Sequence, residues 1–279
     1  AMQYTKPGMI EAEVVGKIHQ IAIAGGGNLS FPVIYTKNGQ ILHNHYHGNT
    51  IKENDLMLCD CGAETASGYA GDMTRTFPAG AKFTERQREI YQIVLNAHTT
   101  AADTLKPGIT YKEVHLKASR KIAEGLKGVG LMKGDTDEAV AAGAHAMFFQ
   151  HGLGHMMGLD VHDMEDLGEE LVGYTDELTK STQFGLKALR LGKALEENFV
   201  LTVEPGIYFI PHLIDSWKAE NKHAEFINYN VLESYKDFGG IRIEEDFAIT
   251  KNGGKLLGTP VAKTIEEVER VRQESLEIA

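Results

Sequence analysis

Apolar residues recur at helical spacing in two stretches that each follow the same tripeptide, Lys-Pro-Gly. Residues 6–14 read KPGMIEAEV, and residues 106–114 read KPGITYKEV. In the first stretch, Ile10, Val14 and Ile18 would share one face of a helix. A Pro-Gly pair just before such a run is typical of a helix start. The pattern therefore predicts two helices that open in the same way.

Runs rich in apolar and β-branched residues predict strands between and after these helices. They cover residues 33–36, 56–61, 69–77, 200–209 and 241–249. Capping boxes, in which a threonine is followed three residues later by Gln or Glu, predict further helix starts. The boxes are Thr84 with Gln87, Thr110 with Glu113, and Thr264 with Glu267. The order of these elements predicts an α/β fold.

A second sequence match follows the two Lys-Pro-Gly helices in the same order. The stretch ENDLMLCD ends at Asp60, and the stretch ENFVLTVE ends at Glu204. Common residue types could produce one such match by chance, but two in the same order favour an internal repeat. We therefore expect residues 1–279 to form a single domain with two similar halves. Segments 164–196 and 211–238 interrupt the strand pattern and are interpreted as insertions.

Composition and charge narrow the classes of partner. Hydrophobic residues make up 42% of the chain and charged residues 24%, which is ordinary for a globular protein. A net charge of −11 argues against nucleic acid or an anionic membrane as a partner. The only cysteines, Cys59 and Cys61, would share one strand face with Cα atoms about 6.5 Å apart, which is poor disulfide geometry. Unpaired, buried thiols fit a cytoplasmic location.

Two carboxylates of the first half would lie near each other. Asp60 ends one predicted strand and Asp72 lies within the next, with a short turn between them. The second half repeats the arrangement with Glu204 and Glu244. If a pseudo-twofold axis relates the halves, four negative charges converge, and two divalent ions would balance them. Oxygen-rich ligation with one or two imidazoles suits Mn²⁺, Co²⁺, Zn²⁺ or Fe²⁺.

The stretch FFQHGLGHMMGLDVHD, residues 148–163, supplies candidate imidazole ligands. His151 and His155 have the spacing of the zinc-binding pair on a metalloprotease helix. In such a helix the residue after the first histidine is a glutamate base, whereas here it is Gly152. The three glycines of the stretch each cost about 1 kcal/mol in a helix interior. We therefore expect a non-helical segment.

Four motifs together resemble the catalytic domain of the Xaa-Pro peptidases, the family of aminopeptidase P and prolidase. They are DCGAETASGYAGDMTRTFP, HGLGHMMGLDVHD, TVEPGIY and GIRIEED. The resemblance covers nearly the whole chain and implies the pita-bread fold, an α/β (α+β) architecture. In this fold two pseudo-symmetric halves surround a curved, mainly antiparallel sheet. Family members usually carry an upstream domain, so we expect the chain to correspond to the catalytic domain alone.

The resemblance also implies which residues bind metal. Asp60 would bind one ion, and Asp72 with Glu244 would bridge both. His155 with Glu204 would complete the second site. The implied cofactor is a pair of divalent ions, with manganese expected and cobalt, zinc or iron as alternatives.

Three histidines would face the substrate by the same resemblance. His151 and His162 would line the site, and His162 would hydrogen-bond the scissile carbonyl or the developing oxyanion. His43 matches the position that borders the proline-binding pocket. His45 and His47 have no counterpart, and we expect them to be exposed loop histidines.

Three further residues would support the reaction. Glu204 would relay a proton to the leaving proline nitrogen. Arg242 lies two residues before Glu244, on the same strand face, and would orient the carboxylates. Tyr208 would play a similar supporting role at the substrate site.

The expected activity is removal of the first residue from proline-containing peptides by an Xaa-Pro aminopeptidase, through attack of a metal-bridging hydroxide. An Xaa-Pro dipeptidase, or prolidase, is the main alternative. Methionine aminopeptidase shares the metal scaffold, and a non-catalytic peptide-binding relative would have lost metal ligands. The full-length protein could form a homo-oligomer.

Overall fold

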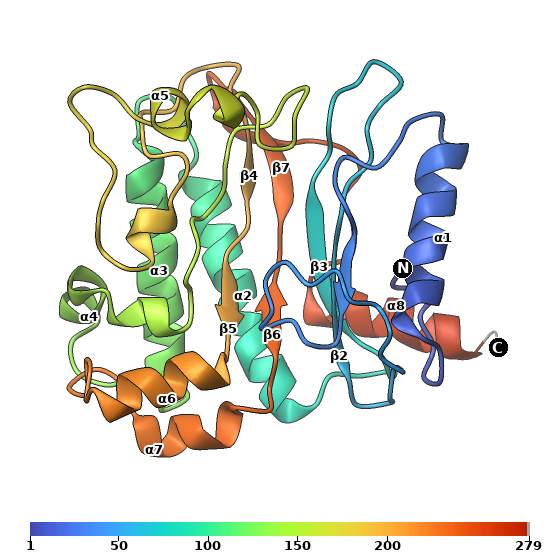
Figure 1. Cartoon of the computed structure of the whole chain (residues 1–279), viewed down its shortest axis with the longest axis horizontal. Coiled ribbons are helices and arrows are strands. Elements are labelled where there is room, and N and C mark those ends of the chain that lie inside the picture. Colours follow the sequence, from blue (N-terminus) through green and yellow to red (C-terminus); the bar gives the residue numbers. More distant parts are fainter. Residues whose placement is uncertain (278–279) are drawn as a thin grey trace.

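The computed structural model describes residues 1–277, and three antiparallel sheets run through the middle of the molecule (Figure 1). The first sheet has the order β1 (Ile34–Thr36), β2 (Leu56–Cys61), β3 (Met73–Pro78). The second has the order β4 (Val200–Val203), β7 (Glu245–Thr250), β8 (Gly253–Leu256). The third pairs β5 (Gly206–Tyr208) with β6 (Gly240–Arg242).

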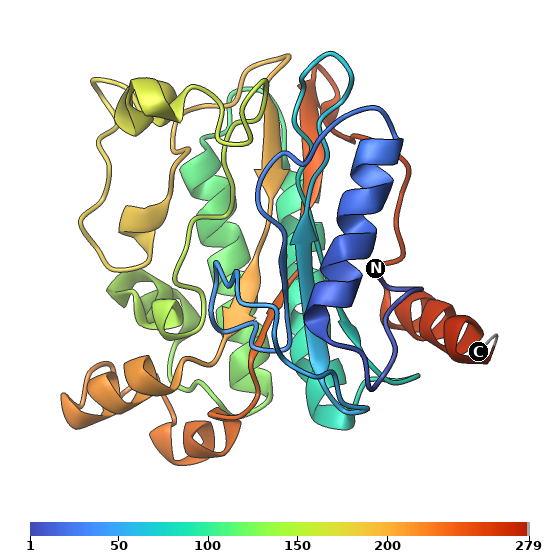
Figure 2. The same ribbon diagram turned by 45° about the vertical axis from the view of Figure 1, so that its right-hand side comes forward.

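Helices cover one side and the edges of these sheets. They are α1 (Glu11–Ala24), α2 (Glu85–Thr104), α3 (Tyr111–Gly128), α4 (Thr136–Ala142), α5 (Glu169–Gly173), α6 (Pro211–Ala219), α7 (Tyr229–Leu232) and α8 (Ile265–Glu277). The long helices α2 and α3 pack against each other behind the strands, while α1 and α8 lie beside the first sheet (Figure 2). Within residues 1–277 no helix combines the length and apolar character that a membrane span requires.

The predicted capping boxes are present. The side chain of Thr84 accepts a hydrogen bond from the backbone of Gln87 at the start of α2. Thr110 caps α3 in the same way. At the start of α8, the Glu267 N–H donates to the Thr264 hydroxyl across 3.2 Å. These local signals set the helix starts because they satisfy backbone donors that a helix leaves unpaired.

The internal repeat is a structural repeat as well. Gly8 N donates to Ile51 O across 2.8 Å in the first half, and Gly108 N donates to Leu195 O across 2.8 Å in the second. Ile51 and Leu195 each lie nine residues before the strand-ending acid of their half. Both glycines have a positive φ, which explains why Gly follows Pro in each tripeptide. Each half therefore begins with the same glycine turn, which is hydrogen-bonded to the segment that leads into the strand ending in the acid.

The second half departs from the predicted strands at its two acids. The predicted strand 200–209 is broken between β4 and β5, because Pro205 has no N–H to donate and the Glu204 N–H donates to Leu153 O instead. The predicted strand 241–249 is broken at residues 243 and 244, where the Glu244 N–H donates to Thr74 O of β3. Each acid thus lies where its strand changes partner.

One boundary in the first half also differs. Asp72 was expected within a strand, but β3 begins only at Met73. The Asp72 N–H donates to the Asp246 carboxylate of the second half, across 3.1 Å, and not to β2. This contact ties the halves together beside the acids.

Candidate metal centre

The acids of the first half lie on one face of the β2–β3 pair. Asp60 is directly opposite Thr74 in the register, and Asp72 lies two residues before Thr74. Residues two apart on an extended chain share a face, so the two carboxylates are diagonal neighbours. Each residue is only 7% exposed. Two buried like charges therefore lie side by side.

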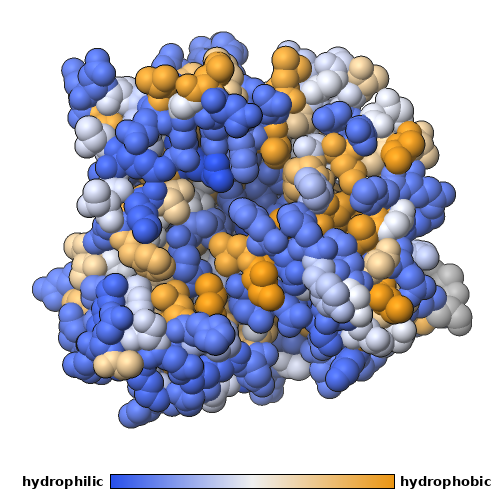
Figure 3. Space-filling model, viewed as in Figure 1, coloured by the Kyte–Doolittle hydropathy of each residue, from blue (hydrophilic) through white to orange (hydrophobic). Residues whose placement is uncertain are grey.

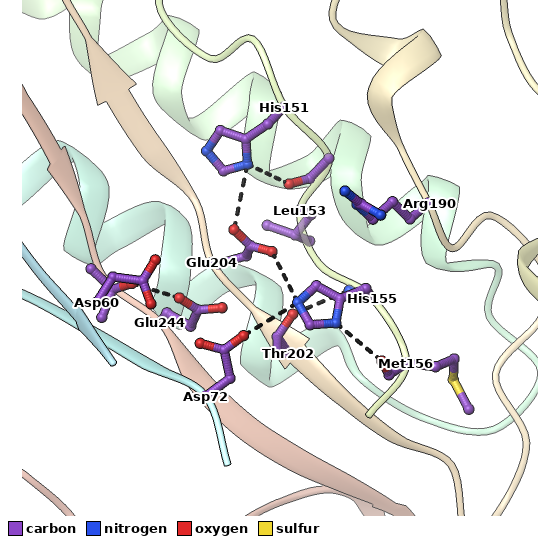
Figure 4. A network of polar contacts seen from close by, with 12 residues as sticks. Asp60, Asp72, His151, Leu153, His155, Met156, Arg190, Thr202, Glu204 and Glu244 are labelled. Carbon is purple, nitrogen blue, oxygen red and sulfur yellow. Dashed lines mark hydrogen bonds and ion pairs between the residues drawn. The ribbon is translucent and has the colours of Figure 1, made fainter. Parts of the chain in front are cut away.

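The acids of the second half and one histidine approach this pair from the opposite side. Figure 4 shows Asp60, Asp72, His155, Glu204 and Glu244 pointing toward a common centre. One ligand atom each of Asp72, His155 and Glu244 lies within 4.8 Å of the other two. His155 Nε2 is 3.4 Å from Asp72 Oδ2 and 3.7 Å from Glu204 Oε1. The structure thus brings together all five residues for which the resemblance implied a metal-binding role.

Backbone contacts orient the His155 ring. Its segment is non-helical, as expected from the glycines, and is bridged to β4 at Met156 and Leu201. The His155 N–H donates to Thr202 Oγ1 across 3.1 Å. On the ring, Nδ1 lies 3.0 Å from Met156 O, so Nδ1 carries the proton. The unprotonated Nε2 then faces the acids, which is the arrangement that a metal-binding histidine requires.

Gly154 allows this segment to approach β4 closely. A Cβ atom at this position would lie 2.2 Å from Thr202 O and 2.6 Å from the Tyr111 hydroxyl. Both distances are shorter than the 3.0 Å below which non-bonded Cβ contacts essentially never occur. Only glycine fits here, and the close approach is what places His155 over the acids.

The charge and burial of the acids in this cluster favour the binding of cations. Burial and the neighbouring carboxylates raise the pKa of Asp72 and Glu244 well above the usual range, and burial raises the pKa of Glu204. Within the described residues, the buried Oδ1 atoms of Asp60 and Asp72 have no hydrogen-bond partner. Buried carboxylates are almost always paired or bound to metal. The cluster therefore has the donor set and the unmet charge of a divalent metal site.

Arg242 donates hydrogen bonds to residues of the acid cluster. Its guanidinium donates to Asp60 Oδ2, to the Tyr208 hydroxyl across 2.9 Å and, through Nε, to Thr74 Oγ1 across 3.0 Å. The Thr74 hydroxyl in turn donates to Glu244 Oε2 across 2.6 Å. Arg242 and Thr74 together hold one carboxylate from each half.

His151 extends the same network toward the substrate side. Its Nδ1 lies 2.7 Å from Gly152 O, so Nδ1 carries the proton, and Nε2 accepts from the Tyr208 hydroxyl across 2.8 Å. Burial lowers the pKa of His151 to about 3, so the ring is neutral. His151 Nδ1 is also 3.5 Å from Glu204 Oε2. The neutral ring therefore faces Glu204 with its N–H.

A cavity of about 390 Å³ opens beside the cluster, and nine of the ten predicted site residues line it. They are His43, Asp60, Asp72, His151, His155, His162, Glu204, Arg242 and Glu244. Tyr208 is fully buried behind them. Burial and the nearby His155 lower the pKa of His162 to about 3, and burial lowers the pKa of His43. The face drawn in Figure 3 is hollowed near its middle, where hydrophilic side chains gather.

Two residues of this site carry no sequence signal of the kind that marked the others. Arg190 lines the cavity and pairs with Glu165, and both belong to the segment interpreted as an insertion. No motif marked Arg190, because long-range folding of the 164–196 segment brings it to the site. Thr74 could have been found, since it lies two residues after Asp72 and so shares its strand face.

The two loop histidines without an assigned role differ from each other. His45 is exposed as expected, although it also lines the mouth of the cavity. His47 is half-buried, and its Nδ1 lies 3.1 Å from Tyr35 O. The expectation of an exposed side chain was wrong for His47 because its ring bonds the β1 backbone.

Comparison with known proteins identifies the family. Residues 1–251 match metallopeptidase family M24. The chain belongs to this family. The M24 chain is 40% identical to mouse Xaa-Pro dipeptidase over 276 residues, which cover 96% of this chain and 54% of the mouse protein. It is 38% identical to a probable Xaa-Pro aminopeptidase of Botryotinia fuckeliana over 254 residues, 91% of this chain and 51% of the fungal protein.

A solved structure confirms the fold of this M24 chain. A variant of Escherichia coli aminopeptidase P in complex with substrate superposes with a TM-score of 0.80 at 36% identity, over 99% of this chain and 55% of that chain. The predicted pita-bread fold with antiparallel sheets is therefore correct. The M24 chain spans about half the length of the curated relatives that it matches.

Proposed function

We propose that the chain is the catalytic part of an Xaa-Pro aminopeptidase, a dinuclear-metal exopeptidase that cleaves the bond before proline at peptide N-termini. The observation that carries the proposal is the convergence of three buried acids, the half-buried Glu204 and His155 beside a histidine-lined cavity. The relatives named Xaa-Pro dipeptidase and Xaa-Pro aminopeptidase support the same substrate class.

The proposed cofactor is a pair of divalent ions, with manganese as the first choice. Asp60 would bind one ion, Asp72 and Glu244 would bridge both, and His155 with Glu204 would hold the second. When bound, such ions supply a nucleophilic hydroxide near neutral pH and polarise the peptide carbonyl. Oxygen ligands with a single imidazole suit Mn²⁺ better than a thiolate set would.

Glu204 is the proposed proton carrier. Its carboxylate lies between two imidazoles, 3.5 Å from His151 Nδ1 and 3.7 Å from His155 Nε2. Burial raises the pKa of Glu204, which brings the carboxyl group closer to the pH at which it can both accept and release a proton. Glu204 would deliver that proton to the proline nitrogen as the secondary amine leaves.

Two other histidines would hold the substrate. The low pKa of His162 keeps its ring neutral, so its N–H can donate to the scissile carbonyl without adding a charge beside the metals. His43 would border the proline ring, together with Ile34 and Leu42 of the same cavity wall. Because the peptide nitrogen of proline carries no hydrogen, this cavity wall needs no hydrogen-bond acceptor at that position.

A second candidate, an Xaa-Pro dipeptidase, is favoured by Arg190. Its guanidinium lines the cavity and is near enough to His162 to contribute to the low pKa of that ring. A dipeptide ending in proline carries a free carboxylate next to the proline ring. Arg190 could bind that carboxylate by a charge-assisted hydrogen bond, which a longer peptide would not offer at this position.

A matched set of substrates tests both candidates on Mn²⁺-loaded protein: Xaa-Pro, Xaa-Pro-Yaa and Met-Ala-Yaa. Cleavage of the tripeptide before proline is expected. Cleavage of Xaa-Pro alone, lost in Arg190→Ala, would replace the aminopeptidase by the dipeptidase. Preference for Met-Ala-Yaa would mean methionine aminopeptidase activity. No cleavage by a protein with two bound ions would overturn the peptidase proposal.

A further inference from the structure

The strand that carries Asp60 presents two thiols on its other face. Cys59 and Cys61 flank Asp60 on β2, and side chains alternate along a strand, so both sulfurs point away from the acid cluster. Their Sγ atoms are 3.9 Å apart. Cys59 is buried, Cys61 is half-buried, and both are free thiols. The proposed peptidase mechanism uses neither.

The two thiols open into a cavity of their own. It has a volume of about 380 Å³, and Met73 lines it directly opposite Cys61 in the β2–β3 register. The lining residues include none of those that line the candidate metal centre. The cavity therefore gives access to both thiols and to the Met73 thioether without passing through the peptidase site.

The separation of the thiols decides between two chemistries. A disulfide needs its sulfurs about 2.05 Å apart, so closing a 3.9 Å gap between residues of one strand would distort β2. Two thiolates on one tetrahedral ion, with bonds of about 2.3 Å, lie about 3.8 Å apart. The observed distance matches the second arrangement without movement of the backbone.

We propose that Cys59 and Cys61 form a second metal site, on the back of β2, that binds one thiophilic cation of the Zn²⁺, Cd²⁺ or Cu⁺ type. Soft thiolate and thioether ligands select such ions, and the Met73 thioether offers a third sulfur. On binding, each thiol releases its proton to solvent and its sulfur donates a lone pair to the ion. Nothing is oxidised or reduced in this step.

The local charge is compatible with a bound cation. Arg75 lines the same cavity, but its guanidinium lies 2.5 Å from the buried carboxylate of Glu245 and also donates to Glu244 O. Glu245 also pairs with Lys263 across 2.7 Å, so the charge that balances a bound cation must come from the two thiolates themselves. An ion that gains two thiolates would be neutral overall when it is divalent.

Titration of Mn²⁺-loaded, reduced protein with Cd²⁺ tests the site, read by the ultraviolet thiolate-to-cadmium charge-transfer band. Carboxylate and imidazole ligands do not produce this band, so the peptidase centre is silent. The expected result is saturation at one Cd²⁺ per chain, loss of the band in Cys61→Ser, and an unchanged band in His155→Ala. A wild-type protein without the band, or a Cys61→Ser protein that keeps it at full strength, would overturn the proposal.

A second measurement does not depend on how the variants fold. Both thiols of the wild type are alkylated with and without one equivalent of Cd²⁺, and the products are counted by mass spectrometry. Cadmium should protect Cys59 and Cys61 together, lowering their alkylation at least tenfold. Equal alkylation with and without the ion, or protection of one thiol alone, would show that the pair does not bind a cation.

Discussion

At the scale of single residues, the His155 ring shows how backbone contacts orient a candidate metal ligand. Met156 O fixes the proton on Nδ1, and Nε2 is left facing Asp72 and Glu204. We predict that His155→Ala binds one metal ion fewer per chain than the wild type and loses nearly all turnover. Metal content after dialysis and steady-state kinetics measure the two effects.

The matched control for this variant is His212→Ala, which removes an exposed histidine of α6. It should keep the wild-type metal content and activity, because no described contact links it to the cluster. A His155→Ala protein with unchanged metal content would remove His155 from the ligand set.

The hydroxyl of Thr74 is a second single-residue test. It donates to Glu244 Oε2 and accepts from Arg242 Nε. In Thr74→Val both partners stay buried while the shared hydroxyl is lost, which costs about 1–3 kcal/mol. We expect this loss to fall on the ordered cluster and to lower kcat roughly 5- to 160-fold, because each 1.36 kcal/mol is a factor of ten in rate.

Thr74→Ser is the rescue for the same position, since it keeps the hydroxyl and removes only a methyl group. We expect kcat within a few-fold of the wild type, and a thermal midpoint close to it. A loss of kcat in Thr74→Ser together with a wild-type kcat in Thr74→Val would mean that packing of the methyl group matters and the hydroxyl does not.

At the scale of elements, the sequence predicts what is local. Capping boxes and the strand β2 were predicted correctly because they depend on neighbouring residues. The breaks at Glu204 and Glu244 were missed, since each depends on a hydrogen bond to a distant segment. Arg190 was missed because long-range folding of the 164–196 segment brings it to the site. Convergence of the acids could be anticipated only because the repeat implied two equivalent halves.

The glycines offer a prediction about the segment that carries His155. In Gly154→Ala the new methyl group would lie 2.2 Å from Thr202 O, so the segment must move away from β4. We expect a lower thermal midpoint and weaker metal binding, because His155 moves with its neighbour. Thermal unfolding and metal titration measure the two losses.

Gly16→Ala in α1 is the matched control, because a Cβ atom there meets nothing within 4 Å. Replacing an exposed helical glycine by alanine should stabilise the protein by roughly 0.5–1 kcal/mol. Opposite signs in the two glycine variants are the expected result. A stabilised Gly154→Ala protein would contradict the close approach at β4.

At the scale of the whole molecule, the cluster of acids joins the two halves. Asp60 and Asp72 come from the first half, and Glu204 and Glu244 come from the second. Without cations, these acids repel one another across the junction, and burial together with this repulsion raises the pKa of Asp72, Glu204 and Glu244. Bound ions would remove this repulsion, because acids from both halves would bind the same ions.

Three buried histidines outside the cluster complicate any measurement of stability against pH. Burial lowers the pKa of His98 and His115 to about 3 and that of His145 to about 4. The unfolded chain binds protons at these residues below about pH 6.5, whereas the folded chain does not. Their contribution is therefore present above pH 6.5 and lost as the pH falls. This histidine contribution is the same with and without metal, so it cancels when the stability of the metal-free protein is subtracted from that of the metal-bound protein.

We predict that the rise in thermal midpoint caused by Mn²⁺ is larger at pH 7.5 than at pH 5. In the metal-free protein, the raised pKa values of Asp72, Glu204 and Glu244 keep more protons on these groups at pH 5, and a metal ion must displace them. As the pH rises, the folded protein alone must give up these protons, so metal-free stability falls while metal affinity grows. Thermal scans with EDTA and with Mn²⁺ at both pH values measure the difference. A metal-induced rise that is equal at the two pH values, or larger at pH 5, would mean that these three carboxylates are not the ligands.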